Sequence, residues 1–401
     1  MNEQTVRFVH SKFKQYYKHK RTRLKLPADL WMREWGFIFF DRYYSSKTVM
    51  RRHKAFNSGI ELQNYIQDNA PAHAFHSAAI YKFPAAPMGK KEWLGADLIF
   101  DLDADHVVTE AELARCSYED LLAVVKRETL KLIDFLLDDF GFQEEDLEVA
   151  FSGSRGYHIH ITKDTVRQLG SRERREIIDY ITATGLEMDT FLRATGEGDL
   201  RLIAEGWGKR LLDGMVQFMH ELAELEEEEA IRKIRNTTGS GSGSSSSMDR
   251  RQIREVIRIA KDQTVMERIE SGQIPRFSRL PAVWKGIARL VTETVRVESA
   301  DRPDEPVTSD IKRLIRLPTS LHGKSSLEVK PLRVDTIPDF EPLEDAVVFG
   351  DADVKVRAIR NSNVKLKGER YELEEGEIAS LPEYAALYFL CRGAAEIEIK
   401  T

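Results

Sequence analysis

Three aspartates, Asp101, Asp103 and Asp105, follow the apolar residues 98–100 at alternate positions. The apolar run indicates a buried strand, and side chains two residues apart on a strand point to the same side. Carboxylates crowded on one face repel each other, and a divalent cation held between their oxygens relieves that repulsion. A solvated, acidic strand end has the same pattern, but the two basic motifs that follow favour a Mg²⁺ or Mn²⁺ site.

A second motif, SGSRGYHIH at residues 152–160, combines glycines, hydroxyls, an arginine and two histidines. We predict a strand over 147–151, a tight turn, and a strand over 157–161. The glycines of the turn let backbone N–H groups approach an anion, and the planar guanidinium of Arg155 can bind phosphate oxygens. His158 and His160 also have the spacing of a zinc-ligand pair, and a plain hairpin is compatible with the same residues.

The third motif is DEPVTSDIKRLIRLPTSLHGK, residues 304–324. We predict a short helix over 310–317 that ends at Pro318, so that Lys312 and Arg316 are i and i+4 neighbours pointing into one cleft. His322 and Lys324 follow in the next loop. A run of solvated surface charges is the alternative for this stretch taken alone.

Taken together, the three motifs supply acidic metal ligands, an anion-binding turn and a basic clamp. These are the parts of a two-metal nucleotidyl-transfer site. The chain has neither a Walker A sequence nor G-x-G-x-x-G, so it resembles neither a P-loop ATPase nor a Rossmann enzyme.

Apolar periodicity predicts the elements that position these motifs. An amphipathic helix over 3–24 is either a surface helix or a nucleic-acid contact. Ser117 is expected to cap a long helix that runs to about Asp139, after which Gly141 stops the chain from continuing as a helix. The Gly/Ser-rich residues 236–248 indicate a flexible linker, natural or engineered. The remaining expected elements are strands over 33–40 and 74–83, a helix from about Ser58 to Asp68, helices throughout 165–235, and helices over 249–270 and 281–294.

Composition sets wide bounds on the function. A chain of 401 residues is long enough for two or three domains, and its net charge of −6 means that any nucleic-acid surface must be a local patch. Two cysteines, Cys116 and Cys391, fit a reducing interior rather than a disulfide framework. We find no apolar run long enough to span a bilayer and no signal peptide, and we therefore expect a cytoplasmic protein without a membrane partner.

In this order, REWGF (33–37), FDLDAD (100–105), FSGSRGYHIH (151–160) and the motif at 304–324 resemble the small, catalytic subunit of archaeal–eukaryotic DNA primase, over roughly residues 25–345. The resemblance implies that Asp101, Asp103 and Asp304 are catalytic and hold the metals, and that Asp310 is a helix N-cap. It also implies nucleotide-binding residues and two further positions lining the cleft. The nucleotide-binding positions are Ser152, Arg155, His158, Arg316, His322 and Lys324, and the further cleft positions are Glu34 and Arg52.

The resemblance further implies an α/β (α+β) fold with a catalytic core on mixed β-sheets. We expect the core at 1–163 and 275–350, a helical insertion with the linker at 164–274, and a small β-rich domain at 351–401. That last domain is similar to the small β-domain of the archaeal GINS replication proteins, so we expect it to dock a replisome partner. Members of the primase family usually carry a cysteine-rich zinc knuckle after the D-x-D strand. Only His106 and Cys116 are available here, so we predict that the structural zinc is absent.

The implied activity is template-directed synthesis of short primers from nucleoside triphosphates on single-stranded DNA, with RNA primers expected and DNA primers as an open alternative. The implied partner is a large primase subunit in a heterodimer. Two alternatives remain: a primase-fold polymerase for repair, and a catalytically inactive nucleic-acid scaffold of the replisome. The intact aspartates argue against the scaffold, since a protein that only binds nucleic acid gains nothing from carboxylates beside phosphates.

Overall fold

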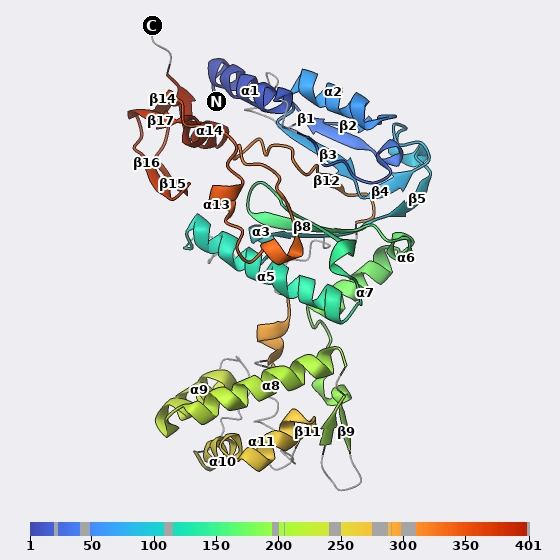
Figure 1. Cartoon of the computed structure of the whole chain (residues 1–401), viewed down its shortest axis with the longest axis vertical. Coiled ribbons are helices and arrows are strands. Elements are labelled where there is room, and N and C mark those ends of the chain that lie inside the picture. Colours follow the sequence, from blue (N-terminus) through green and yellow to red (C-terminus); the bar gives the residue numbers. More distant parts are fainter. Residues whose placement is uncertain are drawn as a thin grey trace. The chain divides into compact units, whose positions relative to one another are not determined.

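A computed structural model describes most of the chain, and its contacts divide it into two units (Figure 1). The first unit is Met1–Ile133, Phe142–Ile178 and Glu298–Thr401, and the second is Asp134–Gly141 and Asp179–Val297. The described residues are 1–19, 23–40, 49–107, 115–194, 200–203, 205–239, 250–274, 288–289, 291–297 and 310–398.

The first unit contains two four-stranded sheets, and every strand pairing in the described residues is antiparallel, where mixed sheets were expected. One sheet has the order β12-β3-β1-β2 and the other β13-β7-β8-β6, with a two-stranded β4-β5 pair beside them. A mixed α and β fold was predicted and is confirmed. The strands are β1 Trp35–Ile38, β2 Met50–Lys54, β3 His73–Ser77, β4 Ala79–Tyr81, β5 Trp93–Ala96, β6 Leu98–Asp103, β7 Leu147–Phe151, β8 Gly156–Ile161, β12 Leu314–Arg316 and β13 Pro331–Leu332.

The helix predicted over 310–317 is wrong, because this stretch forms a turn followed by strand β12. The Asp310 carboxylate accepts a hydrogen bond from the backbone N–H of Lys312 at 2.9 Å, which turns the chain into the strand instead of capping a helix. β12 then pairs with β3, with Ile315 opposite His76. A short apolar run fits either period, and pairing with a strand so distant in sequence decides between them.

Several short helices and two long ones accompany the sheets of the first unit. Ser58 caps α2 by accepting from Glu61 N at 3.2 Å, and the Ser117 hydroxyl accepts from Asp120 N at 3.1 Å at the start of α5, so both predicted helix starts are confirmed. The single strand predicted over 74–83 is instead β3 and β4. The helices are α1 Glu3–Lys18, α2 Gly59–Asn69, α3 Ala104–Val107, α5 Tyr118–Asp138, α6 Asp164–Arg167, α7 Ser171–Ile181 and α13 Pro342–Asp345, with 3₁₀ turns at Leu30–Met32, Met88–Lys90, Glu144–Asp146 and Val334–Thr336.

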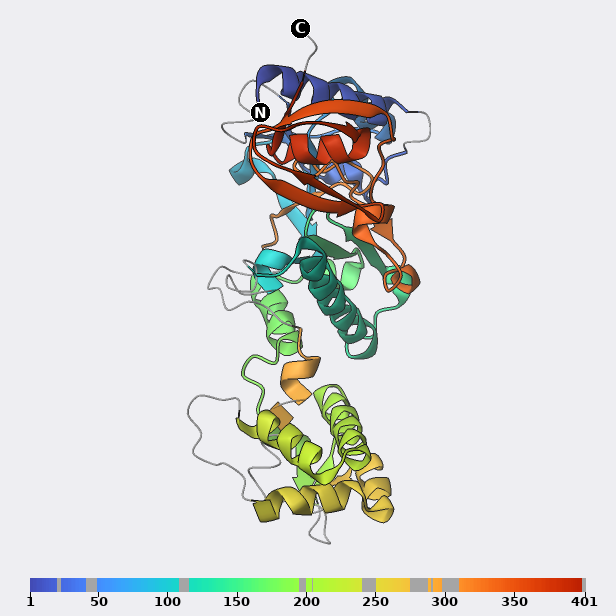
Figure 2. The same ribbon diagram turned by 90° about the vertical axis from the view of Figure 1, so that its left-hand side faces the viewer.

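We call residues 353–397 the C-terminal module. Its strands curve around one helix, α14, whose residues Tyr384–Cys391 are all buried (Figure 2). A helix that is apolar on all sides must be enclosed in this way. The module's sheet has the order β17-β14-β18, beside a β15-β16 hairpin. Its elements are β14 Asp353–Ala358, β15 Ser362–Leu366, β16 Glu369–Leu373, β17 Ile378–Pro382, α14 Glu383–Cys391 and β18 Ala395–Ile397.

The second unit is mainly helical around its own apolar core, which includes Met219, Leu222, Ile253 and Ile269. The expectation of helices throughout 165–235 is wrong in part, because a small sheet of order β11-β10-β9 lies in this unit. The elements are 3₁₀ turn Met188–Phe191, β9 Leu192–Ala194, β10 Leu200–Leu202, α8 Trp207–Glu224, α9 Glu227–Gly239, α10 Arg250–Ala260, α11 Gln263–Glu270 and β11 Gln273–Ile274. Residues 236–239 of the predicted linker therefore belong to α9, and residues 240–248 lie outside the described residues.

Within the described ranges, no helix has both the length and the apolar character needed to cross a membrane.

Candidate active site

The acidic strand β6 buries its apolar half and presents its carboxylates at the other end. Leu98, Ile99 and Phe100 are each at most 3% exposed, whereas the side chains of Asp101 and Asp103 are 13% and 26% exposed. Asp105 was expected on the same strand but lies in helix α3. Its backbone N–H donates to Asp103 Oδ1 at 3.2 Å. The strand therefore aligns two carboxylates, and the third joins them through the helical turn that follows.

This crowding alters the ionisation of Asp103. Burial is the largest effect that raises its pKa, and the negative charges of Asp101 and Asp105 raise it further. The N–H of Asp105 and the guanidinium of Arg155 oppose these effects without cancelling them. A cation held at these oxygens would relieve the same repulsion.

Strand β8 places His158 opposite Asp101 in the antiparallel register. The His158 ring is buried, and its Nε2 lies 3.4 Å from Asp101 Oδ1. Burial and the charges of Arg316 and Arg313 lower the pKa of His158 to about 3, so the ring is neutral at neutral pH. Among the described residues neither ring nitrogen has a hydrogen-bond partner. Buried polar atoms without partners are costly, so these nitrogens are suited to a ligand.

The turn at residues 152–156 is shaped by its glycines and by Ser152. Gly153 has φ +80°, and a Cβ there would stand 2.7 Å from Cβ of His322, so only glycine allows the third motif to approach the turn this closely. The Ser152 hydroxyl accepts from the N–H of Gly156 at 3.2 Å, so Ser152 fixes the turn from within. Arg155 forms an ion pair with Asp105, and its Nη2 lies 3.6 Å from Asp103 Oδ1.

The third motif adds two arginines, one immediately before β12 and one at its last position. Arg313 Nη2 lies 3.3 Å from Asp101 Oδ2, a contact that the sequence reasoning missed. Arg316 lies over the Phe75 ring, 5.5 Å from its centroid, and its Nε is buried without a partner in the described part of the chain. The charges of Asp101 and Asp103 both act on Arg316, although burial lowers its pKa more than they raise it. Arg316 was predicted as a helical residue, and its place in a strand keeps it beside the carboxylates.

His322 follows in the loop and is buried against His73, another residue that the sequence reasoning missed. Their rings meet edge to face with centroids 4.7 Å apart, and His322 Nδ1 lies 3.1 Å from Ser325 Oγ. Burial, followed by the charges of Arg316, His73, Lys324 and Arg392, holds the pKa of His322 well below its usual range. Lys324 itself is exposed. His322 thus lies between Gly153 of the turn at 152–156 and the exposed Lys324.

Glu34 and Arg52 form a pair of their own between β1 and β2. Arg52 donates from Nε and Nη2 to the two oxygens of Glu34 at 2.9 and 3.1 Å, and the N–H of His53 donates to Glu34 Oε1 at 3.1 Å. Buried Lys91 lies 3.6 Å from Glu34 Oε2. Although burial raises the pKa of Glu34, the hydrogen bonds from Arg52 and His53 lower it overall. These contacts bind the first sheet together, and they do not reach Asp101 or Asp103.

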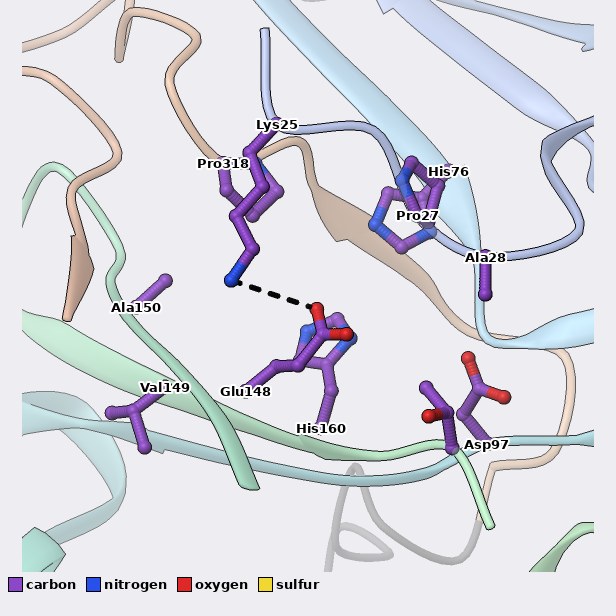
Figure 3. A pocket seen from close by; sticks show the side chains of 11 residues that line it. Lys25, Pro27, Ala28, His76, Asp97, Glu148, Val149, Ala150, His160 and Pro318 are labelled. Atoms are coloured by element: carbon purple, nitrogen blue, oxygen red, sulfur yellow. Dashed lines mark ion pairs between the residues drawn. The ribbon is translucent and has the colours of Figure 1, made fainter. Parts of the chain in front are cut away.

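A small cavity lies beside His160, on the face of β8 that also carries His158, and farther from Asp101 and Asp103 (Figure 3). His76, His160, Asp97 and Glu148 help to line it, and Lys25 Nζ points toward Glu148 Oε2 at 3.9 Å. Its volume of about 10 Å³ is room for one water, so it is no site for a nucleotide.

The structure thus brings Asp101, Asp103, Arg155, His158 and Arg316 together, with the loop of His322 and Lys324 against the turn. Asp304 lies outside the described residues. Within the described ranges, no group of three His, Cys, Asp or Glu side chains is arranged to hold a metal ion. Cys116 is exposed, and the predicted absence of a structural zinc remains a prediction.

Comparisons with known proteins match the chain to one family over most of its length. The family model described as "DNA primase small subunit" matches residues 100–334, a range that contains all three motifs. A DNA primase small subunit PriS from Methanococcoides burtonii is 44% identical over 409 residues, covering 99% of each chain. Relatives with the same name from Methanothrix thermoacetophila and Methanocella arvoryzae are 41% and 40% identical, each covering 99% of this chain and 100% of its own.

Proposed function

This chain belongs to the DNA primase small-subunit family, and from that membership we propose which of its residues carry out primer synthesis. The chain is the catalytic subunit of a DNA primase, a nucleotidyltransferase that makes primers on a DNA template. Relatives named DNA primase small subunit align with this chain over nearly their whole length. Neither a repair polymerase nor an inactive scaffold is therefore favoured.

Asp101 and Asp103, with Asp304, would hold the divalent cations on which primases depend, and Mg²⁺ or Mn²⁺ suits such oxygen ligands. The crowded pair with a raised pKa at Asp103 supports this proposal. When bound, the cations lower the pKa of the attacking 3′-hydroxyl and neutralise the leaving pyrophosphate. Asp304 enters through the family resemblance alone.

The arginines near these carboxylates bind the triphosphate. Arg316 has a buried Nε without a partner in the described part of the chain, and a phosphate oxygen would satisfy it. Arg155 and Arg313 pair with Asp105 and Asp101 respectively, and a triphosphate competes for both guanidinium groups. Exposed Lys324 adds a fourth positive charge at the end of the motif.

The two histidines act as neutral hydrogen-bonding groups. The pKa of His158 is about 3, so its ring adds no positive charge and can donate one N–H to a phosphate oxygen. His322 is held by Ser325 Oγ on one side, which leaves its other nitrogen for the nucleotide. Ser152 acts by holding the turn, and Glu34 with Arg52 acts by joining β2 to β1.

The proposal includes partners and a domain division. A small subunit acts with a large primase subunit, and we propose a heterodimer that binds single-stranded DNA template and nucleoside triphosphates. We also retain the core at 1–163 and 275–350, the insertion at 164–274, and residues 351–401 as a docking domain for a replisome partner.

One observation supports the site most strongly: nitrogens of His158 and Arg316, which have no hydrogen-bond partner in the described part of the chain, lie beside the carboxylates of Asp101 and Asp103. The test is template-dependent primer synthesis with Mg²⁺ or Mn²⁺, with and without the large subunit. Asp101→Ala and Asp103→Ala should abolish synthesis, whereas Asp164→Ala, which removes a 97%-exposed carboxylate, should leave it intact. Normal synthesis by either site variant at saturating Mn²⁺ would refute the assignment.

Nucleotide binding tests the phosphate contacts separately. Arg155→Ala and Lys324→Ala should weaken nucleoside triphosphate binding by roughly ten- to a hundredfold, the effect of losing a charge-assisted contact. Unchanged affinity in both variants would show that the basic groups do not contact the triphosphate.

A further inference from the structure

Arg392, the residue that follows α14 in the C-terminal module, packs against two tyrosines whose ring centroids lie 6.5 Å apart. Its guanidinium carbon lies 4.7 Å from the ring centroid of Tyr388, which belongs to α14, and 4.9 Å from that of Tyr118, the first residue of α5. Stacking on aromatic faces suits a guanidinium, and desolvated pairs of this kind are stronger than exposed ones. Arg392 therefore connects the module to the start of α5.

Tyr118 carries this connection into the active site. Its hydroxyl donates a hydrogen bond of 2.6 Å to the carbonyl oxygen of Ser154, in the middle of the turn at 152–156. Ser152 Oγ fixes that turn from within, and Ser325 Oγ donates to the Gly153 carbonyl from the other side. Tyr118 thus links α5 to the turn at Ser154, the residue immediately before Arg155.

The charges agree with this geometry. Burial is the main cause that raises the pKa of Tyr118, so its hydroxyl keeps its proton and remains a donor at neutral pH. The positive charges of Arg392 and Arg155 both act on Tyr118, and that of Arg392 also reaches His322. Arg392 is therefore within electrostatic range of the second and third motifs.

We propose that the C-terminal module is a working part of the nucleotide site: Arg392, packed against the rings of Tyr118 and Tyr388, positions the turn at 152–156 through the Tyr118 hydroxyl. Arg392 and Tyr118 are positioning residues for Arg155. The inference rests on the proposed function of that turn in binding triphosphate. It adds a second role to the docking role that we propose for this segment.

The module has anchors that do not involve Arg392, which makes the proposal testable by substitution. Lys12 Nζ pairs with Glu383 at 2.9 Å, the N–H of Asn2 donates to Glu396 at 2.7 Å, and the N–H of Ile397 donates to Thr5 Oγ1 at 3.0 Å. These contacts hold the module to α1. A variant at Arg392 should therefore fold with the module still in place.

The experiment compares Tyr118→Phe, Arg392→Met and the double variant of the full chain with its large subunit. Tyr118→Phe keeps the ring and removes only the hydroxyl, and Arg392→Met keeps much of the volume and removes the charge. The matched control is Arg357→Met, since Arg357 is a cation of the same module that pairs with Glu398 at 3.0 Å. Readouts are the KM and kcat of primer extension, the affinity for a fluorescent ATP derivative, and thermal melting.

Each single variant should raise the KM and the Kd for nucleotide about three- to tenfold, the factor that one hydrogen bond commonly provides, with kcat within about twofold. The double variant should be no worse than the weaker-binding single variant, because both residues act through one contact. Arg357→Met should match the wild type.

Any of three results would overturn the inference: unchanged KM and Kd in Tyr118→Phe, independent additive effects in the double variant, or an equal loss of nucleotide binding in Arg357→Met. Arg155→Ala separates it from the proposed function. If Arg155→Ala weakens nucleotide binding and Tyr118→Phe does not, only the positioning role fails; if Arg155→Ala has no effect, the role of the turn itself fails.

Discussion

Two aspartates four positions apart in one segment, Asp97 and Asp101, are held in opposite ways. Asp97 is 1% exposed, and its carboxylate pairs with Arg33 at 2.6 Å and with Arg167 at 3.2 Å. Its carbonyl oxygen accepts from Arg174 at 2.7 Å. Asp101 is 13% exposed, and its nearest basic groups, Arg313 and His158, stand at 3.3 and 3.4 Å.

This difference distinguishes a carboxylate that stabilises the fold, Asp97, from one that we propose takes part in the reaction, Asp101. A buried carboxylate is stable only when cations compensate it closely, and around Asp97 the protein supplies them itself. Around Asp101 the pairing is loose, and nitrogens of His158 and Arg316 have no partner in the described residues. The Asp97 carboxylate is compensated at close range by two arginines of the protein, and we propose that a metal ion and phosphate complete the compensation around Asp101.

The largest effect should come from the third proposed ligand. Asp304→Ala should reduce primer synthesis by more than about a thousandfold without lowering the melting temperature, because a catalytic metal ligand acts on the reaction rather than on folding. Asp310→Ala removes only the hydrogen bond to the Lys312 N–H and should keep most of the activity. Primer extension and thermal melting on both variants check this, and an active Asp304→Ala beside an inactive Asp310→Ala would place the ligand at residue 310.

Asp97→Asn should show the opposite phenotype. Removing that charge leaves the guanidinium of Arg33 buried without its carboxylate partner, so unfolding should become easier by about 3–5 kcal/mol. The fraction that stays folded at low temperature should still synthesise primers. Denaturant unfolding paired with extension assays measures both, and a stable but inactive Asp97→Asn would break the distinction between the two clusters.

Arg313→Ala tests the loose pairing itself. Without this guanidinium, Asp101 is freer to accept a cation, so Mn²⁺ should bind more tightly when no nucleotide is present. Nucleoside triphosphate should bind more weakly by about 1.5–3 kcal/mol. The control is Lys312→Ala, since Lys312 is the exposed cation next to it. Equal Mn²⁺ affinity in Arg313→Ala and the wild type would show that the arginine does not compete for Asp101.

The smallest effect concerns Glu34, whose carboxylate, like that of Asp97, forms ion pairs with two basic side chains. Its folded-state pKa is lowered from 4.5, so the stability that it contributes is fully present above that value. As the pH falls below 4.5 and through the folded-state pKa, that contribution should disappear. The melting temperature of the wild type should therefore fall more steeply over this pH range than that of Glu34→Gln. Parallel pH profiles would mean that Glu34 is not held as a carboxylate.

Local sequence was enough to predict the acidic strand, the glycine turn and the capped helices, because their signals lie within a few residues. Asp101 and Asp103 are two positions apart, and Gly153 and Gly156 define one turn. The strand β12 was mistaken for a helix because residues 311–315 fit both periods and only pairing with β3 selects the strand.

The missed partners share one cause. Arg313 reaches Asp101, and Tyr118 reaches Ser154, across long stretches of sequence that no spacing rule connects. The sheet of order β11-β10-β9 depends in the same way on Leu200 pairing with Ile274. Such contacts are set by tertiary packing, and a single sequence contains no direct signal for them.

The central claim is that Asp101 and Asp103 form a cation site that the protein leaves incompletely compensated. Mn²⁺ binding to the full chain, measured by electron paramagnetic resonance together with thermal melting, tests it most directly. The wild type and the exposed-site control Asp164→Asn should bind Mn²⁺ alike, whereas Asp101→Asn and Asp103→Asn should lose most of that binding and melt no earlier. Wild-type Mn²⁺ affinity in both Asp101→Asn and Asp103→Asn would contradict the account.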